Sequence, residues 1–352
     1  MKIAIDLTFL YGRKWTGIEY YSIDLYRTLL HTGNEIYPIV HERNDIDNNP
    51  HTQIIHSRSR LILENVSLSK MVRKVGADIV IFPAFPPPID IWYACKSRIY
   101  VVVHDLVPLN KFRMTMPKIP RNYYAIKLKK ALWKASGIIT VSESIKKELS
   151  FYTDRPVYNC GENISSEYLN CEKKGTQEHL KRWNLEPDQY MISVSTIEPR
   201  KNPKYLLSVA EKMNPKKKLV LVGKMRKTRD RELQRMLEEA VSRGNVIVTG
   251  YIDTDCLISL YKYSYAFILL SGYEGFGRGP FEAVASGCRR IILSDIDIFR
   301  ETFHDNATYI PLNGKDVCVE FPLPKVDNDF KIPFNVLDIN IMKLFKQGRN
   351  SV

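Results

Sequence analysis

The chain has 352 residues, of which 44% are hydrophobic and 26% charged, so it is long enough to form two globular domains. No run approaches the roughly 20 apolar residues of a membrane span. The N-terminal run MKIAIDLTFL is interrupted by Asp6, which indicates a buried first strand and not a signal peptide. The net charge of +13 favours an anionic partner, and the lack of zinc fingers and RNP motifs argues against nucleic acid.

The six cysteines form no CxxC pair and show no zinc-ligand spacing, which is typical of reduced, packed thiols. Together with the missing signal peptide, this predicts a cytoplasmic protein.

Short runs rich in Val and Ile recur along the chain, and each is followed by a stretch with helical periodicity. We expect strands at Ile3–Leu7, Asp78–Phe82, Arg98–Val103, Gly137–Val141, Tyr190–Ser195, Lys218–Val222, Asn245–Thr249, Ala266–Leu270 and Arg290–Leu293. Continuous apolar strands that alternate with helices predict parallel sheets covered on both faces. Buried helix stripes are expected at Ile18, Tyr21, Leu25 and Leu29, and at Leu233, Leu237, Ala240 and Val241.

The pattern breaks between Asn159 and Lys181, a segment with Gly161, Gly175 and several Asn and Ser, where we place an interdomain linker. The predicted division is an N-terminal Rossmann-like domain at 1–165, a C-terminal Rossmann-like domain at 166–320, and a tail at 321–352 that either crosses back onto the first domain or is mobile. Doubly wound domains bind ligands at the carboxyl ends of their strands, so functional residues should directly follow strands.

The most informative segment is SGYEGFGRGPFEAVASGC, residues 271–288, which follows the predicted strand Ala266–Leu270. Its glycines allow backbone N–H groups to approach an anion at the start of the next helix, where the helix dipole adds positive charge. Pro280 suits the first turn of that helix and Gly287 its end. Glu274 in the loop and Glu282 in the helix could bind hydroxyl groups of a sugar and a ribose; two solvated glutamates beside a glycine turn are the alternative.

A second segment, TIEPRKNP, residues 196–203, follows the predicted strand Tyr190–Ser195. Its adjacent cations, Arg200 and Lys201, lie next to a helix start, where they could neutralise a diphosphate.

These two segments resemble motifs of the family-4 retaining glycosyltransferases. Glu274 to Glu282 is similar to their E-x7-E motif, and Glu198 to Asn202 to their EPRKN segment. Looser matches are the loop ending at Gly17, the segment VHDL at His104 and the segment TVSES at residues 140–144. The resemblance covers roughly residues 1–310 and implies the GT-B fold, in which two doubly wound α/β domains with parallel sheets face each other across a cleft. It implies that the domain at 1–165 is the acceptor side and that the domain at 166–320 binds the nucleotide sugar.

The resemblance also implies roles for individual residues. Arg200 and Lys201 would bind the donor phosphates and stabilise the leaving nucleotide, and His104 would contact the sugar near the reacting carbon. Glu274, with the backbone of Gly275, Phe276 and Gly277, would hold the transferred sugar, and Glu282 the ribose. The base would lie against Gly250, Tyr251 and Ile252, and Gly17 would approach the phosphates.

The implied reaction is a metal-independent, retaining transfer of a hexose from a nucleotide diphosphate, with GDP-mannose as the first candidate, to a glycan or lipid-linked glycan. No cofactor is expected, and Asp295 and Asp297 in SDID are interpreted as a turn, not as a metal site. A GT-B sugar-nucleotide epimerase and an inactive nucleotide- or glycan-binding subunit are the alternatives.

Three other features bear on the site. Arg278-Gly279 replaces the family's Leu-Pro and adds a cation, and Glu19 replaces a second glycine near Gly17. His104 could also be a packed histidine, and Asp105 a turn or helix-cap residue. The basic stretch KLKKALWK, residues 127–134, with Leu128, Ala131 and Leu132 facing inward, is most simply a solvated helix face, although anionic lipid headgroups would suit it.

Overall fold

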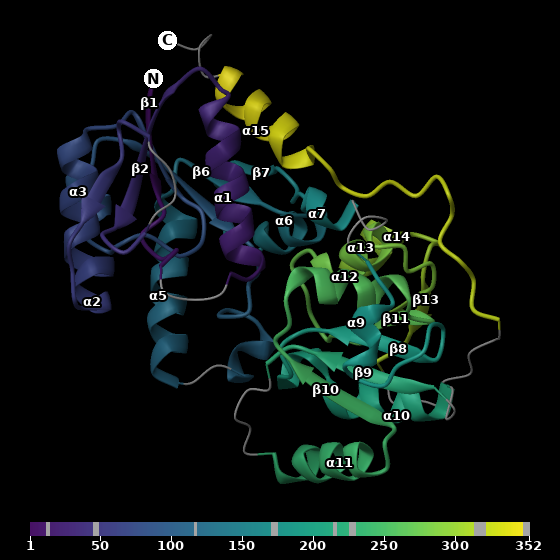
Figure 1. Ribbon diagram of the computed structural model, residues 1–352. Helices are drawn as coiled ribbons and strands as arrows, with labels where there is room; N and C mark the ends of the chain where they lie inside the picture. Colours follow the sequence, from purple (N-terminus) through teal and green to yellow (C-terminus); the bar gives the residue numbers. More distant parts are fainter. Residues whose placement is uncertain are drawn as a thin grey trace. The chain divides into compact units, whose positions relative to one another are not determined.

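A computed structural model describes residues 1–11, 15–44, 49–115, 118–169, 175–213, 217–224, 230–312 and 322–347 (Figure 1). The chain forms two compact units, and each is described here on its own. The first comprises Met1–Asn163 and Asn335–Val352, and the second comprises Ile164–Phe334. The first unit therefore ends two residues before the predicted limit of 165, and it takes up the chain again inside the predicted tail.

The first unit is built on a seven-stranded parallel sheet with the order β3-β2-β1-β4-β5-β6-β7. The strands are β1 (Lys2–Asp6), β2 (Glu35–His41), β3 (Gln53–Ile55), β4 (Ile79–Phe82), β5 (Arg98–Val103), β6 (Gly137–Thr140) and β7 (Val157–Asn159). The four predicted strands of this half are confirmed within one residue at each end. The fully buried β4 and β6 show why continuous apolar runs identify parallel strands.

Strands β2, β3 and β7 were not predicted from the sequence. Pro38 argues against a strand at β2, because proline removes a hydrogen-bond donor from a sheet. The proline is tolerated because β3 pairs with β2 only at Ile39–His41. At Pro38, β2 therefore has a neighbouring strand on one side alone, where Ile5 of β1 lies. The short β3 and β7 have three residues each, too few for a recognisable period.

Helices connect these strands. They are α1 (Gly17–Leu30), α2 (Arg60–Ile62), a π-helical turn (Leu63–Ser67), α3 (Leu68–Val75), α4 (Ile91–Ala94), a 3-10 helix (Lys111–Thr115), α5 (Lys118–Lys134), α6 (Glu143–Leu149) and α15 (Val336–Gln347). In α1 the predicted stripe is confirmed at Tyr21, Leu25 and Leu29, which are fully buried, whereas Ile18 is only partly buried.

Helix α15 packs beside α1 in the first unit (Figure 1). It buries Leu337, Ile341 and Phe345, and the Phe345 ring lies 5.6 Å from that of Tyr100 on β5. Polar contacts reinforce the packing, since the amide of Asn163 donates to Asp338 at 2.8 Å.

The second unit is built on a six-stranded parallel sheet with the order β10-β9-β8-β11-β12-β13. The strands are β8 (Tyr190–Val194), β9 (Lys218–Val222), β10 (Val246–Gly250), β11 (Ala266–Leu269), β12 (Ile291–Ser294) and β13 (Thr308–Ile310). Only β13 was not predicted. The helices are α7 (Ser166–Leu169), α9 (Glu178–Lys181), a 3-10 turn (Pro199–Lys201), α10 (Pro203–Met213), α11 (Arg231–Ser242), α12 (Thr254–Lys262), α13 (Arg278–Ala285) and α14 (Asp297–Phe303).

Both faces of this sheet are buried. Met191, Leu219 and Ile268 face the core formed with α10 and α11. Alternate residues point the other way, where Tyr190 donates a hydrogen bond to the carbonyl of Leu260 on α12 and Phe267 packs 6.0 Å from Tyr261. Successive residues of a strand point to opposite faces of the sheet, and both faces are apolar here. These strands therefore look uniformly hydrophobic in the sequence.

One prediction needs correction here. Val241 is exposed and does not belong to the buried stripe of α11, because that stripe follows Leu233 and Leu237 with Ala240 only partly buried.

The boundary between the two units, after Asn163, falls inside the segment from Asn159 to Lys181 in which the linker was placed. The described part of this segment beyond Asn163 includes α7 and α9, which belong to the second unit, where Tyr168 packs on Tyr261.

Each sheet has one point at which the order of strands reverses direction, between β1 and β4 in the first unit and between β8 and β11 in the second. Chains leaving adjacent strands at such a point diverge to opposite faces and leave a crevice at the carboxyl ends. Each unit therefore offers one site for a ligand.

Candidate functional site

In the second unit, the two motifs of the sequence meet at the reversal point. The segment after β8 carries Arg200 and Lys201 in a 3-10 turn, and the loop after β11 carries Glu274. The backbone N–H of Gly272 donates to the carbonyl of Arg200 at 2.9 Å, which joins the two loops. Asn202 has a left-handed conformation that ends the turn and starts α10.

Glu274 lies between the two cations. Its carboxylate accepts from the Lys201 ammonium and from Nη1 of Arg200, the latter at 3.3 Å. Nη1 of Arg200 also donates to the carbonyl of Tyr273 at 2.8 Å, and Nη2 donates to Glu198 at 3.1 Å. The carboxylate is only 8% exposed and the cations 17% and 15%. The side chains are therefore fixed before any ligand binds.

The electrostatics of this cluster keep Glu274 ionised. Burial alone would raise the pKa of its carboxyl, but Lys201 and Arg200 outweigh burial and hold the pKa below 4.5. Because the pKa is lowered in the folded state, the ion pairs contribute stability at neutral pH. That contribution is lost as the pH falls through the folded-state pKa.

The glycine loop leads directly into α13. Gly277 has a φ of +83°, and a β-carbon there would lie 2.7 Å from the Phe299 ring, so only glycine fits. Phe276 is buried and stacks on Phe281 at 5.3 Å, so its side chain belongs to the core and only its backbone can face a ligand. Gly287, with a φ of +98°, follows the end of α13, as predicted.

Glu282 lies one helical turn after Arg278 on α13, and these two residues form an ion pair at 3.2 Å. The hydroxyl of Tyr261 also reaches Glu282, at 3.4 Å. Arg278, the additional cation noted in the sequence, thus forms an ion pair with Glu282. Both side chains are 12% exposed.

The predicted base-binding segment follows β10. Gly250 has a φ of +71°, Tyr251 exposes 56% of its surface, and Ile252 is buried. An exposed aromatic ring beside a glycine can stack on a base, whereas Ile252 offers only its backbone. Asp253 caps α12 by accepting from the N–H of Cys256 at 2.8 Å.

Gly223, directly after β9, was not among the site residues predicted from the sequence. Its φ is +135°, its N–H donates to the carbonyl of Gly250 at 2.9 Å, and an added β-carbon would lie 2.2 Å from the carbonyl oxygen of Ser195. It thereby joins the loops after β8, β9 and β10. The sequence indicates it only as a glycine after a strand, Val222-Gly223-Lys224.

The two remaining predicted site residues, Gly17 and His104, lie in the first unit. Gly17 is the first residue of α1, and Thr16 before it bonds to Glu19 through both its backbone and its hydroxyl. Glu19, which is buried, thus forms a capping box. This explains a glutamate where the family often has glycine.

His104 follows β5 and packs edge-on against Tyr21, with ring centroids 4.7 Å apart. Its Nε2 lies 2.7 Å from the carbonyl oxygen of Pro83. A carbonyl only accepts, so Nε2 carries the proton and a neutral ring keeps Nδ1 as an acceptor. Asp105 accepts from the N–H of Val107 at 3.1 Å, so it is a turn residue.

Within the described ranges, His, Cys, Asp and Glu side chains form no group of three that could hold a metal ion. Asp295 pairs with Arg300 at 2.7 Å, and Asp297 begins α14.

Residues 176–316 match the family described as "Glycosyl transferases group 1". The matched segment lies within the second unit. It contains the Arg200–Lys201–Glu274 cluster, Glu282 and the segment after β10, so the sequence resemblance to this kind of enzyme is confirmed.

Two curated relatives add to this match. The serotype-specific mannosyltransferase WbdA of Escherichia coli is 31% identical over 227 residues, which is 61% of this chain and 28% of WbdA. The O-antigen chain mannosyltransferase RfbU of Salmonella typhimurium (strain LT2) is 26% identical over 211 residues, 60% of this chain and 56% of RfbU. The chain therefore spans only about a quarter to a half of the length of these relatives.

Solved structures match over the whole chain. The Anabaena protein HepE, in complex with UDP and glucose, covers 100% of both chains with a TM-score of 0.65 at 13% identity. WaaG, a glycosyltransferase of lipopolysaccharide biosynthesis, covers 99% of this chain and 91% of its own with a TM-score of 0.62 at 12% identity. These likenesses establish the fold, and the predicted GT-B architecture with two parallel α/β sheets is confirmed.

Proposed function

We propose that the chain is a retaining glycosyltransferase that transfers a hexose from a nucleotide diphosphate to a glycan acceptor. The observation that carries the proposal is the pair of fixed cations, Arg200 and Lys201, held by the buried Glu274 at the strand-order reversal of the group 1 domain. GDP-mannose is the first candidate donor, since the two curated relatives are named as mannosyltransferases.

The cations act on the charge that grows on the departing diphosphate. An ammonium group can donate three hydrogen bonds, and Lys201 gives one to Glu274. Two donors are left for phosphate oxygens. Glu274 holds both cations in place, so little reorganisation is needed when the charge develops. Its remaining lone pairs can accept a hydroxyl of the transferred sugar.

The backbone supplies the rest of the donor site. The N-terminus of α13, which follows Gly277, would direct backbone N–H groups and a partial positive charge toward the diphosphate. Glu282 would bind ribose hydroxyls, and the exposed ring of Tyr251 would stack on the base. In the first unit, Gly17 at the start of α1 and Nδ1 of His104 stay the sequence-based candidates for binding phosphate and sugar.

In the proposed reaction, the bond between the anomeric carbon and the phosphate oxygen breaks and a bond from the acceptor oxygen forms on the same face of the sugar. The acceptor proton passes to the departing phosphate oxygen. No protein nucleophile and no metal ion take part, because Arg200, Lys201 and the helix N-terminus supply the positive charge.

A screen of nucleotide sugars in the presence of EDTA tests this function. GDP-mannose at about one hundred times its dissociation constant should stabilise the protein by roughly 2.7 kcal/mol, with UDP- and dTDP-sugars as comparisons. Stabilisation by no nucleotide sugar would contradict the proposal. Proton NMR of the donor alone separates an epimerase, which converts it without an acceptor, from a transferase.

A basic and aromatic surface of the first unit supports contact with an anionic membrane, where a lipid-linked acceptor would lie. None of the helices that the structure describes has the length and hydrophobicity required to cross a bilayer. Helix α5 contains six Lys and Arg and no acidic residue. Trp133 on this helix is 69% exposed, and the ammonium groups of Lys130 and Lys134 lie 4.4 Å from the centroid of the exposed Tyr93 ring.

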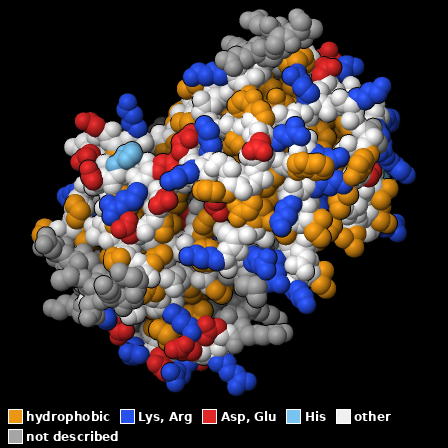
Figure 2. All heavy atoms as spheres, turned by 180° about the vertical axis from the view of Figure 1, so that it is seen from behind, with side chains coloured by type: hydrophobic (Ala, Val, Ile, Leu, Met, Phe, Trp, Pro, Cys, Tyr) orange, Lys and Arg blue, Asp and Glu red, His pale blue; other side chains and the backbone are white. Residues whose placement is uncertain are grey.

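Other side chains extend this surface. The exposed Phe151 lies in the segment next to the end of α5, since Arg155 donates to the carbonyl of Trp133 at 2.8 Å. At the upper right of Figure 2, hydrophobic and basic side chains are interspersed with few acidic ones. Aromatic rings beside lysines suit the interface of an anionic bilayer.

We expect the protein to float with vesicles of phosphatidylcholine containing 30% phosphatidylglycerol and not with phosphatidylcholine alone. Each lysine near the surface contributes about 1 kcal/mol, so replacing both Lys130 and Lys134 with glutamate should abolish flotation. Arg235→Glu, at a 73% exposed position on α11, is the matched control and should float normally. Flotation that both variants retain would contradict the assignment of this surface.

A further inference from the structure

Arg278 occupies a position at which a cation is unfavourable. It is the first residue of α13, and the partial positive charge of a helix N-terminus disfavours a cation there. Its side chain is also only 12% exposed. The family that the sequence resembles has Leu-Pro where this chain has Arg278-Gly279. A buried cation at such a place requires a compensating contact, and Glu282 supplies one at 3.2 Å.

The carboxylate of Glu282 is held at both of its oxygens. Nε of Arg278 donates to Oε1 at 3.2 Å, and the hydroxyl of Tyr261 donates to Oε2 at 3.4 Å. Tyr261 is fully buried on α12, where burial and the charge of Glu282 raise the pKa of its hydroxyl well above 10, so it keeps its proton and donates. The Tyr261 ring is fixed in turn, since it packs 6.0 Å from Phe267 and 6.4 Å from Tyr168. The carboxylate is therefore oriented before a ligand arrives.

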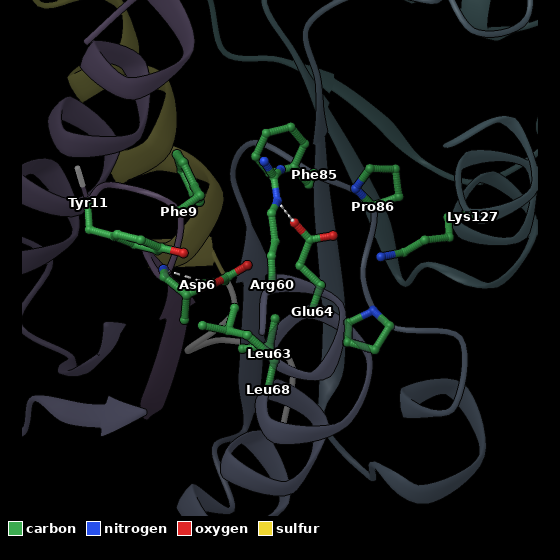
Figure 3. A pocket seen from close by; sticks show the side chains of 12 residues that line it. Asp6, Phe9, Tyr11, Arg60, Leu63, Glu64, Leu68, Phe85, Pro86 and Lys127 are labelled. Carbon is green, nitrogen blue, oxygen red and sulfur yellow. Dashed lines mark hydrogen bonds and ion pairs between the residues drawn. The ribbon is translucent and has the colours of Figure 1, made fainter. Parts of the chain in front are cut away.

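The first unit shows what burial does to a carboxyl group that is held by neutral donors. Asp6, at the end of β1, is 5% exposed and lines a pocket of about 230 Å³ (Figure 3). The backbone N–H and the hydroxyl of Thr8 donate to its Oδ1 at 3.0 Å and 2.7 Å. Burial nevertheless raises the pKa of Asp6 to about 6. Neutral donors are thus not enough to keep a buried carboxyl firmly ionised.

A cation that only lies near the carboxyl group is not enough either. Lys127 of α5 lines the same pocket and is 3% exposed, with its ammonium 3.3 Å from the hydroxyl of Tyr123 (Figure 3). Burial and Thr8 affect the pKa of Asp6 more than the charge of Lys127 does. Lys127 thus does not belong to a solvated face of α5, contrary to the sequence-based expectation, because its helix turns this position inward beside Leu128.

Glu274 shows the opposite case. It is 8% exposed, and burial alone would raise the pKa of its carboxyl, but Lys201 and Arg200 touch it and hold that pKa below 4.5. Glu282 has a contacting cation in Arg278 and is buried to a similar degree. By the same reasoning, Arg278 keeps Glu282 a charged acceptor.

A fixed, charged carboxylate suits two neighbouring hydroxyl groups. A carboxylate has about four acceptor positions, so a group held by one donor on each oxygen can still accept two hydroxyls. The 2′- and 3′-hydroxyls of a ribose lie on the same face of the ring and can donate to the two oxygens together. A 2′-deoxyribose lacks one of them. Sites built to bind a hydroxyl reject the analogue without it, because their buried polar groups are left unpaired.

We propose that Arg278, together with Tyr261, is a positioning residue that holds Glu282 for the ribose diol, so that the donor is a ribonucleoside diphosphate sugar and not a 2′-deoxyribonucleoside diphosphate sugar. The inference rests on the proposed function, in which Glu282 binds the ribose. It separates GDP- and UDP-sugars, which carry both hydroxyls, from dTDP-sugars, which do not.

Calorimetric titration with matched nucleotides tests the inference, with GDP against 2′-deoxy-GDP and UDP against 2′-deoxy-UDP as probes. For the base that binds, the wild type should bind the ribonucleotide at least about tenfold more tightly than the deoxynucleotide. Arg278→Leu should weaken both and reduce this ratio below about threefold, whereas Arg278→Lys, which restores a cation, should keep it above that value. Arg300→Leu is the matched control, because Arg300 pairs with Asp295 at 2.7 Å, and its ratio should equal that of the wild type.

A second variant tests the same positioning with little risk to the fold. Tyr261→Phe removes one oxygen and keeps the packed ring, and it should lower the ratio by about twofold to fivefold. The ratio compares two ligands on one protein. A general loss of stability weakens both ligands alike and leaves the ratio unchanged, so a merely structural role of Arg278 or Tyr261 would not alter it.

The outcomes distinguish this inference from the donor proposal. A wild type that binds neither base in either form overturns both. Equal affinity for a ribonucleotide and its deoxy counterpart overturns this inference alone, as does a tenfold ratio that persists in both Arg278→Leu and Tyr261→Phe. In transfer assays, the loss in Arg278→Leu should appear mainly in the donor KM, because the ribose is bound alike in the ground state and the transition state.

Discussion

Replacing Lys201 with methionine should lower the rate of sugar transfer by roughly a hundredfold to a thousandfold. Methionine retains the length and apolar stem of lysine but cannot donate to the diphosphate. Glu274 keeps Arg200 as a partner, so the fold should survive. The loss should appear mainly in kcat, because the charge on the leaving group is greatest in the transition state. Steady-state kinetics with the best donor of the screen measure it.

Lys204→Met is the matched control. Lys204 lies three residues further along, on α10, and pairs with Asp230 at 2.9 Å and with Glu232, away from Glu274. Its kcat should stay within about twofold of the wild type. Arg200→Ala should repeat the loss seen for Lys201→Met. If Lys201→Met kept a kcat similar to that of Lys204→Met, the proposed role of the cation pair would be wrong.

Replacing Gly223 with alanine should destabilise the second unit by about 2–4 kcal/mol, because the added β-carbon would lie 2.2 Å from a carbonyl oxygen at a φ that side chains rarely adopt. The loops after β8 and β10 would have to move apart, so affinity for the donor should fall as well. Calorimetry should show a decrease in Tm of roughly 5–15 °C.

Gly244→Ala provides the comparison, since Gly244 also has a positive φ, +75°, but no atom within 4 Å of an added β-carbon. It should cost only about 1–2 kcal/mol, the strain of the left-handed conformation, and leave donor affinity intact. Equal effects of the two substitutions would show that the contact with Ser195 is not what requires glycine at position 223.

The sequence was most informative where the chain is most buried. Strands β5 and β9 were predicted with their observed ends, because an uninterrupted apolar run has one simple explanation in a parallel α/β sheet. Strand β2 was not predictable, because its proline is tolerated only where β3 does not pair with β2. Strand β3 was not predictable because three residues are too few to show a period.

The residues of the candidate site were likewise predictable only in part. Glu274 and Arg200 stand out because glycines and charges cluster after strands, whereas Gly223 needed the carbonyl of Ser195 to show its importance. Asp6 and Lys127 are 121 residues apart and lie in ordinary-looking segments, a broken apolar strand and a basic helix. Only the folded structure shows that both line one pocket.

The placement of α15 has a consequence for biosynthesis. When a ribosome has made the first 163 residues, the groove beside α1 still lacks the leucine, isoleucine and phenylalanine that will occupy it. That apolar groove stays open to water until the whole second unit has been translated. The nascent first unit therefore remains incomplete and prone to association until the segment from Asn335 onward emerges from the exit tunnel.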